Sequence, residues 1–238
     1  MGLKSELLSI TALSQMDRDR MFQLMVEHYD NIKYCSFRND LMEKDSVLIL
    51  KDEEGILQGF TTIKIFEYPV NGVPVRLAFS GDTIIDKDHW GSLELHRSWI
   101  RAVYSLVGGD KGEAYWLLIS KGYKTYRFLP VYFHSFYPCY NKETPEFEKK
   151  IIDTFCKYRH HEYYKADKGV ICFNGEKDFL KKGIADISEK HMKDPHIKFF
   201  VTRNPGYLMG DELVCLTKLT SVNMRSMVLR YLQEERLT

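Results

Sequence analysis

Long hydrophobic runs are missing from this sequence. No stretch of about 18 apolar residues occurs, so no segment is predicted to cross a membrane. The first six residues, Met-Gly-Leu-Lys-Ser-Glu, lack the apolar centre of a signal peptide, and Glu6 stands where N-myristoylation requires Ser or Thr. We therefore expect a cytoplasmic protein.

An excess of charge of one sign is also missing. The chain carries 34 Lys and Arg against 33 Asp and Glu, a formal net charge of +1. No overall field attracts the protein to nucleic acid or to anionic lipid, so we expect neither as a partner. Any anion that the protein binds must be held by a local site.

Metal-binding and nucleophile motifs are scarce. The five cysteines lie far apart without a Cys-x-x-Cys pair, which argues against a zinc site or a disulfide framework and indicates reduced, mostly buried thiols. His160 and His161 are adjacent and cannot face one metal from a helix, while His191 and His196 are five residues apart. Ser135 lacks the Gly-x-Ser-x-Gly context of a hydrolase nucleophile. We therefore expect no metal site.

The chain does have enough apolar sequence for a sizeable core. It is 44% hydrophobic and 28% charged over 238 residues, and it shows no repeat, low-complexity tract or linker. We expect one domain over residues 1–238. Its core is residues 1–141, and residues 142–238 form a C-terminal elaboration that supplies a final strand and helix.

Periodicity and turn signals predict the order of elements in the first half. Two helices, 14–29 and 34–44, precede three strands, 46–50, 57–66 and 73–85. Asn71-Gly72 between the last two strands is a strong hairpin signal, so the strands form an antiparallel meander. The remaining expected elements are a helix over 95–106, a strand over 114–119, an aromatic helix over 123–137 interrupted by Pro130, helices over 145–164 and 178–190, strands over 169–173, 197–202 and 212–219, and a closing helix over 224–231.

One strand-to-helix connection stands out chemically. Residues 79–93 run from a strand through a short loop directly into a helix. A helix N-terminus presents free N–H groups and a positive dipole end, which suits a phosphate. Gly91 allows a ligand to approach the backbone closely, and Ser92 can cap the helix. An ordinary strand-to-helix connection with a capping serine would have the same residues.

The order of elements and the position of this loop resemble the acyl-CoA N-acyltransferase (GNAT-like) family. The resemblance covers residues 7–141, with a final strand from 212–219, and implies a mixed α/β (α+β) fold with a mainly antiparallel sheet flanked by helices. The family's loop pattern, Gln/Arg-x-x-Gly-x-Gly/Ala, aligns with Asp88-His89-Trp90-Gly91-Ser92-Leu93, where Gly91 matches. Asp88 and Leu93 depart from the pattern. A carboxylate at Asp88 would repel a pyrophosphate, which implies reduced use of acetyl-CoA.

The resemblance also implies a co-substrate, acyl-CoA or acyl-phosphopantetheine, and residues that bind it. These are Thr83, Ile84, Ile85, Trp90, Gly91, Ser92 and Leu93. Backbone N–H groups at a break in the strand near Thr83–Ile85 would stabilise an oxyanion.

Three side chains are the candidates for catalysis. Asp82 is expected to be the general base or amine anchor, with a surface charge at a strand end as its alternative. His96 is a second candidate base, or else a solvated helix residue. Tyr132 stands where the family places a tyrosine that protonates the leaving thiolate, with Tyr126 as an alternative and core packing as the simpler explanation of both.

The implied reaction is transfer of an acyl group, with a medium or long fatty acyl chain expected from the aromatic segment 123–137. The donor would be acyl-CoA or an acyl carrier protein, and the acceptor a small-molecule or peptide amine. The alternative is a non-catalytic GNAT-like module that binds an acyl ligand or a protein partner.

Overall fold

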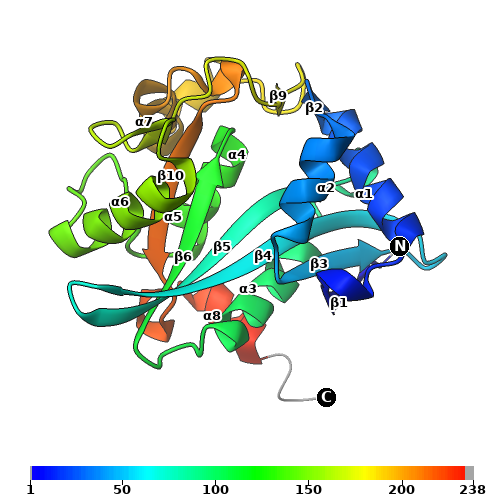
Figure 1. The fold of residues 1–238 in the computed structure, drawn as a ribbon, viewed down its shortest axis with the longest axis horizontal. Coiled ribbons are helices and arrows are strands. Elements are labelled where there is room, and N and C mark those ends of the chain that lie inside the picture. The colour runs from blue at the N-terminus through cyan, green and yellow to red at the C-terminus, as the bar shows by residue number, and fades with distance from the viewer. Residues whose placement is uncertain (1, 234–238) are drawn as a thin grey trace.

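The computed structural model describes residues 2–233 (Figure 1) and is built on one eight-stranded sheet. Its order is β1-β3-β4-β5-β6-β10-β8-β7, and only the β5–β6 pair is parallel. The strands are β1 (Lys4–Ser9), β3 (Ser46–Lys51), β4 (Leu57–Val70), β5 (Val73–Ile85), β6 (Glu113–Ser120), β7 (Tyr164–Lys165), β8 (Val170–Ile171) and β10 (Glu212–Lys218). The predicted mixed, mainly antiparallel sheet is confirmed.

Helices cover both faces of this sheet. They are α1 (Gln15–His28), α2 (Tyr34–Met42), α3 (Glu94–Leu106), α4 (Tyr123–Tyr126), α5 (Phe128–Tyr132), α6 (Glu146–His160), α7 (Pro195–Arg203) and α8 (Ser226–Gln233). One face packs against α1, α2 and α6, and the other against α3, α5, α7 and α8 (Figure 1). Within residues 2–233, no helix combines the length and apolar character needed to cross a membrane.

Local signals in the sequence explain the best-defined elements. The Ser14 hydroxyl accepts a hydrogen bond from the Asp17 N–H (3.0 Å) and caps α1. Asn71 and Gly72 have φ values of 50° and 80° in the two-residue turn between β4 and β5, as this hairpin requires. In α3, Leu95, Trp99 and Val103 are buried at helical spacing against the sheet.

Two elements expected from the sequence are wrong. The helix over 178–190 is instead an irregular segment that contains β9 (Phe179–Leu180), because Gly183 (φ 90°) and the Asp186 carboxylate, which accepts the Gly183 N–H, form a turn. The strand over 197–202 is helix α7. The Asp194 side chain accepts the His196 N–H at 2.9 Å and Pro195 occupies the first turn, and these start signals outweigh the β-branched composition.

Two further differences concern element boundaries. Strand β1 was not predicted; it pairs with β3 in register from Lys4↔Lys51 to Ser9↔Ser46. The aromatic segment 123–137 is not one helix, since α5 ends at Tyr132 and the chain then turns extended at Phe133 to pair with Met224.

Candidate active site

A bulge in β5 lies where this strand separates from β6. Ile63 pairs with Ser80 and Thr61 with Thr83, so Gly81 and Asp82 oppose the single residue Thr62. The parallel pairing with β6 ends at Ser80↔Leu118. A bulge bends its strand and redirects the side chains, so the end of β5 turns away from β6. The backbone groups on that side of β5 therefore have no β6 partner. The break predicted near Thr83–Ile85 therefore begins two residues earlier.

A cleft of about 640 Å³ opens where the two strands separate, and residues from both faces of the sheet line it. Its lining includes Phe37 and Asp40 of α2 from one face and Leu95 and Phe128 from the other. Nine of the ten predicted site residues line it: Asp82, Thr83, Ile84, Ile85, Trp90, Gly91, Ser92, Leu93 and His96. The tenth, Tyr132, lines a small adjoining cavity of about 30 Å³, which it shares with His96.

Asp82 is the carboxylate that the bulge turns into the cleft. Burial and the nearby Asp40 charge raise the pKa of Asp82 to about 6, against the opposing effect of Lys44 and Lys121. Its side chain has no hydrogen bond or ion pair with any other part of residues 2–233. A carboxylate with this pKa and no partner is able to accept a proton or to bind an ammonium group at neutral pH.

His96 and Tyr132 lie together on the opposite side of the cleft from α2. Burial lowers the pKa of His96 to about 4, so the imidazole is neutral at pH 7, and its Nδ1 is buried without a partner. Its ring lies 4.4 Å from that of Phe128 and 5.9 Å from that of Tyr132. Tyr126, the alternative acid, donates its hydroxyl to the Pro138 carbonyl (3.0 Å) in the core and is therefore already committed.

The loop before α3 ends in a helix N-terminus that faces the cleft. The first helical hydrogen bond runs from Arg97 N–H to Leu93 O (3.0 Å), so the preceding N–H groups have no helical acceptor. Gly91 has φ 109°, and a Cβ built there would meet no atom within 4 Å. Asp88, in contrast, is exposed and outside the cleft lining, which removes the basis of the expected repulsion.

Trp90 and Lys124 connect the two walls of the cleft. The Trp90 indole N–H donates to the Ile85 carbonyl (3.0 Å), and the Lys124 ammonium lies 4.1 Å from the centre of the indole ring. Lys124 also donates to the Ile184 carbonyl (2.6 Å). A ligand that pairs with the backbone of β5 at Ile85 has to displace the Trp90 contact.

The C-terminal part supplies one end of the cleft, which sequence reasoning missed. Residues 174–191, here called the roof, include β9, which pairs with β2 (Tyr29–Asp30) after α1 (Figure 1). Lys121, which follows β6, forms ion pairs with Asp178 of the roof and Glu212 of β10. The only sequence signal was that Lys121 and Glu212 are charges next to the apolar runs 114–119 and 213–216.

No cluster of three or more His, Cys, Asp and Glu side chains able to hold a metal ion occurs in the part of the chain that is described. The groups that fit a ligand are instead the N–H groups at the start of α3 other than those of Ser92 and Glu94, which already donate to the His89 carbonyl and the Ser92 hydroxyl, and the backbone of β5 that has no β6 partner. Together they can receive a phosphate and an extended amide chain.

The chain order α1-α2-β3-β4-β5-α3-β6-α4 is the order that the family resemblance predicted, and the loop between β5 and α3 lies on the cleft. The fold is GNAT-like. The final strand that the resemblance implies, over 212–219, is β10, which pairs antiparallel with β6.

No protein-family model and no curated protein matches the sequence. Solved structures do match. A conserved protein from Enterococcus faecalis V583, described as a probable N-acyltransferase, is 14% identical, with a TM-score of 0.42 over 57% of this chain and 33% of that one. A GNAT family N-acetyltransferase from Escherichia coli in complex with CoA is 14% identical, with a TM-score of 0.38 over 51% of this chain and 65% of that one. A Trypanosoma brucei acetyltransferase is 13% identical, with a TM-score of 0.40 over 60% and 98%. The matched part spans less than two thirds of the first two proteins.

Proposed function

We propose that the protein transfers an acyl group from a pantetheine thioester, acyl-CoA or an acyl carrier protein, to the amine of a small molecule or peptide. The observation that carries this proposal is the β5 bulge. It places an uncommitted carboxylate, Asp82, beside the unpaired backbone of the same strand, inside a cleft reached from both faces of the sheet.

Each part of the site has a role in this reaction. Asp82 binds the amine and removes its proton, because a base with a pKa near the working pH is most effective. Backbone N–H groups of Thr83–Ile85 that lack a β6 partner stabilise the oxyanion of the tetrahedral intermediate. Tyr132, whose ring lies 5.9 Å from that of His96, would protonate the departing thiolate, and neutral His96 is a second candidate base.

The donor is held at the other end of the cleft. The Ser92 N–H donates to the His89 carbonyl and the Glu94 N–H to the Ser92 hydroxyl, so the N–H groups of Gly91, Leu93, Leu95 and His96 bind the phosphates, since a helix N-terminus favours an anion. The pantetheine amides would pair with the end of β5, in place of the Trp90–Ile85 contact.

Release of free thiol tests the proposal. The protein is mixed with acyl-CoA or an acyl carrier protein and a panel of amines, and thiol and acylated amine are quantified together. Stoichiometric thiol and amide support acyl transfer. Tight thioester binding without thiol release over the whole panel would support the non-catalytic binding module instead.

A substitution at Gly91 tests the donor site. Gly91→Val is expected to weaken CoA binding about tenfold or more, because the side chain enters open cleft space and strains a positive φ. Gly72→Val is the matched control. Gly72 also has a positive φ (80°) with no atom near its Cβ, but it lies at the β4–β5 hairpin tip. The CoA affinity, by calorimetry, and the thermal unfolding are measured for both variants. Equal CoA affinities of the two variants would show that the loop is not part of the donor site.

The acyl chain is proposed to be of medium or long length. Apolar residues of the cleft, such as Ile84, Leu95 and Phe128, support this proposal. The cavity beside Tyr132 holds only about 30 Å³, room for about two water molecules, so a longer chain has to lie in the wide cleft.

We expect octanoyl-CoA to exceed acetyl-CoA in kcat/KM by about tenfold, measured by thiol release at one acceptor concentration. Asp88→Gln is expected to change neither rate, because the carboxylate is exposed outside the cleft. A preference for acetyl-CoA would refute the chain-length proposal and leave acyl transfer intact.

A further inference from the structure

Six charged side chains gather at the end of the cleft below the roof. They form a group, here called the charged chamber, made of Asp82, Lys121, Arg159, Lys177, Asp178 and Glu212. They come from β5, the end of β6, α6, the roof and β10, so no single segment of the chain produces them. The carboxylate of Asp40, which pairs with Arg159, also lines the cleft.

Most of these charges already have a partner of opposite charge, inside or next to the chamber. Lys121 contacts Asp178 closely and lies 3.5 Å from Glu212. Arg159 pairs with Asp40 at 3.1 Å and with Glu43 at 2.8 Å. These pairs neutralise buried charge and hold the walls together, so they are not available to a ligand without a compensating cost.

Asp82 and Lys177 are the least committed charges of the chamber. Asp82 has no hydrogen bond or ion pair among the described residues. Lys177 forms only a long ion pair with Glu212 (3.7 Å), lies 4.5 Å from the centre of the Phe173 ring, and keeps 40% of its side chain exposed. The two charges have opposite sign and line the same cleft, on different walls.

His160 adds a buried polar atom without a partner to the lining of this chamber. Its Nε2 has no hydrogen-bond partner, and the residue lines the cleft. Burial lowers the pKa of His160 to about 4, so the ring is neutral, and the tautomer with its proton on Nε2 can donate from that atom. A buried polar atom without a partner costs free energy unless a ligand or water satisfies it.

We infer that the acyl acceptor is a small amine that carries an anionic group of its own, a carboxylate or a phosphate. This inference rests on the proposed acyl transfer. The amine binds Asp82 next to the unpaired strand, and the anionic group binds Lys177 and the N–H of His160. An uncommitted carboxylate and a loosely held ammonium group complement a ligand that carries both signs, whereas a simple diamine would bring a second positive charge towards Lys177.

The roof limits the size of this acceptor. The β2–β9 pair (Figure 1) and the contact from Lys181 N–H to His28 O (3.0 Å) fix the roof to the end of α1. The volume of about 640 Å³ must hold the acceptor together with the arm of the thioester. The acceptor is therefore a metabolite or a single exposed side chain and not a folded protein surface.

Matched pairs of acceptors test the inference. Each α-amino acid is compared with its carboxamide, and O-phosphoethanolamine with ethanolamine, by thiol release with one acyl-CoA. At least one anionic member is expected to exceed its neutral partner about tenfold or more in kcat/KM. The two arms distinguish a carboxylate from a phosphate.

Variants of Lys177 assign the preference to this side chain. Lys177→Met is expected to raise KM about tenfold for the preferred anionic acceptor and to leave its neutral partner unchanged, and Lys177→Glu should reverse the order of the two. Lys182→Met is the control, since Lys182 is exposed in the same roof and outside the cleft lining.

The outcomes separate the two proposals. Neutral and anionic acceptors of equal kcat/KM in every pair would overturn the inference while acyl transfer stands. If no amine is acylated although acyl-CoA binds, acyl transfer is refuted, and calorimetric binding of the same acceptor pairs then decides the ligand class. Selective binding of the anionic members would support the chamber as an amine-and-anion site, and no selectivity would overturn it.

Discussion

Asp82→Asn is expected to lower turnover by about 10²-fold or more and, at pH 7, to make the protein more stable. The first effect is the usual scale for the loss of a general base. It requires that Asp82 be the group that takes the proton, as its position in the bulge and its lack of any partner suggest.

The sign of the stability effect follows from the pKa of Asp82. Burial raises it from 3.8 to about 6, so between these values the folded protein binds more protons than the unfolded chain. Stability then falls as the pH rises through this window, and the loss is complete above about pH 6. Asparagine carries no charge and avoids this loss. We expect a gain of about 1–2 kcal/mol at pH 7, discounted for the partial exposure of the side chain.

Activity and unfolding across pH 4–9 measure both effects. The wild-type kcat/KM should rise with pH with an apparent pKa near 6, and this rise should be absent from the residual activity of Asp82→Asn. Asp88→Asn removes an exposed carboxylate six residues away and serves as the control. A near-normal rate for Asp82→Asn, together with lower stability, would show that Asp82 has a structural role only.

The part of the site that lies on β5 and α3 could be predicted because its residues are local. Gly91, Ser92 and Asp82 all fall within one strand–loop–helix connection, and the order of elements indicated where this connection belongs. The hairpin at Asn71-Gly72 could be predicted for the same reason, since its turn depends on two adjacent residues with positive φ.

The charged chamber could not be predicted because it is made by the tertiary structure. Lys121 and Glu212 come together only when β10 pairs with β6, and Asp178 joins them only because the roof folds back onto α1. The sequence predicted a helix over 178–190, with Asp178 at its start. Side-chain to backbone contacts such as Asp186–Gly183 decided the local structure instead.

Lys121→Met is expected to cause the largest loss of stability among single substitutions that remove one charge. The Lys121 side chain is only 11% exposed and stands between Asp178 and Glu212, which are equally buried. Burial alone would lower the pKa of Lys121, but Glu212 and Asp178 outweigh it and hold that pKa above its usual value. The ammonium group is therefore charged at every pH in ordinary use.

Removal of this ammonium leaves the buried Asp178 carboxylate without its cation and Glu212 with only the more distant Lys177, at 3.7 Å. Such a loss typically costs about 3–5 kcal/mol, a large fraction of the roughly 5–15 kcal/mol that stabilise a folded domain. The roof also loses its closest tie to β6, since Asp178 is the roof residue that Lys121 contacts. We therefore expect a weaker acceptor affinity together with the lower free energy of unfolding.

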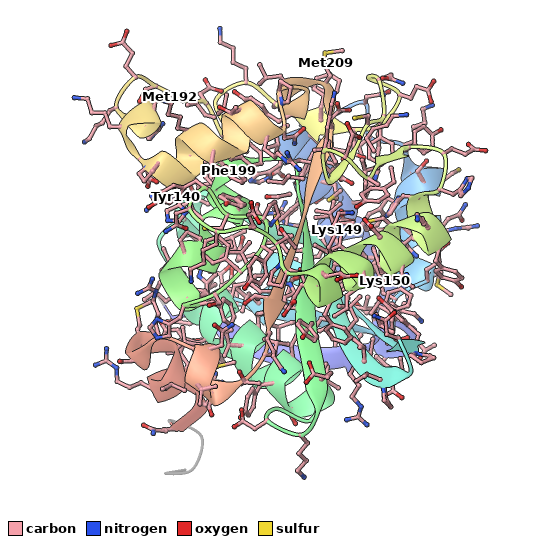
Figure 2. All side chains as sticks on the ribbon, turned by 90° about the vertical axis from the view of Figure 1, so that its left-hand side faces the viewer. Tyr140, Lys149, Lys150, Met192, Phe199 and Met209 are labelled. Atoms are coloured by element: carbon pink, nitrogen blue, oxygen red, sulfur yellow. The ribbon has the colours of Figure 1, made fainter. Side chains whose placement is uncertain are left out.

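Urea unfolding at pH 7 compares Lys121→Met with Lys149→Met. Lys149 forms an ion pair with Asp153 (2.8 Å) on the outer face of α6 (Figure 2), where its side chain is 53% exposed, so its loss should cost less than about 1 kcal/mol. Addition of Asp178→Asn to Lys121→Met should recover part of the lost stability, because one unpaired charge is removed. Equal small losses for the two lysines, with no recovery by Asp178→Asn, would mean that water screens the Lys121 cluster and that it does not hold the roof.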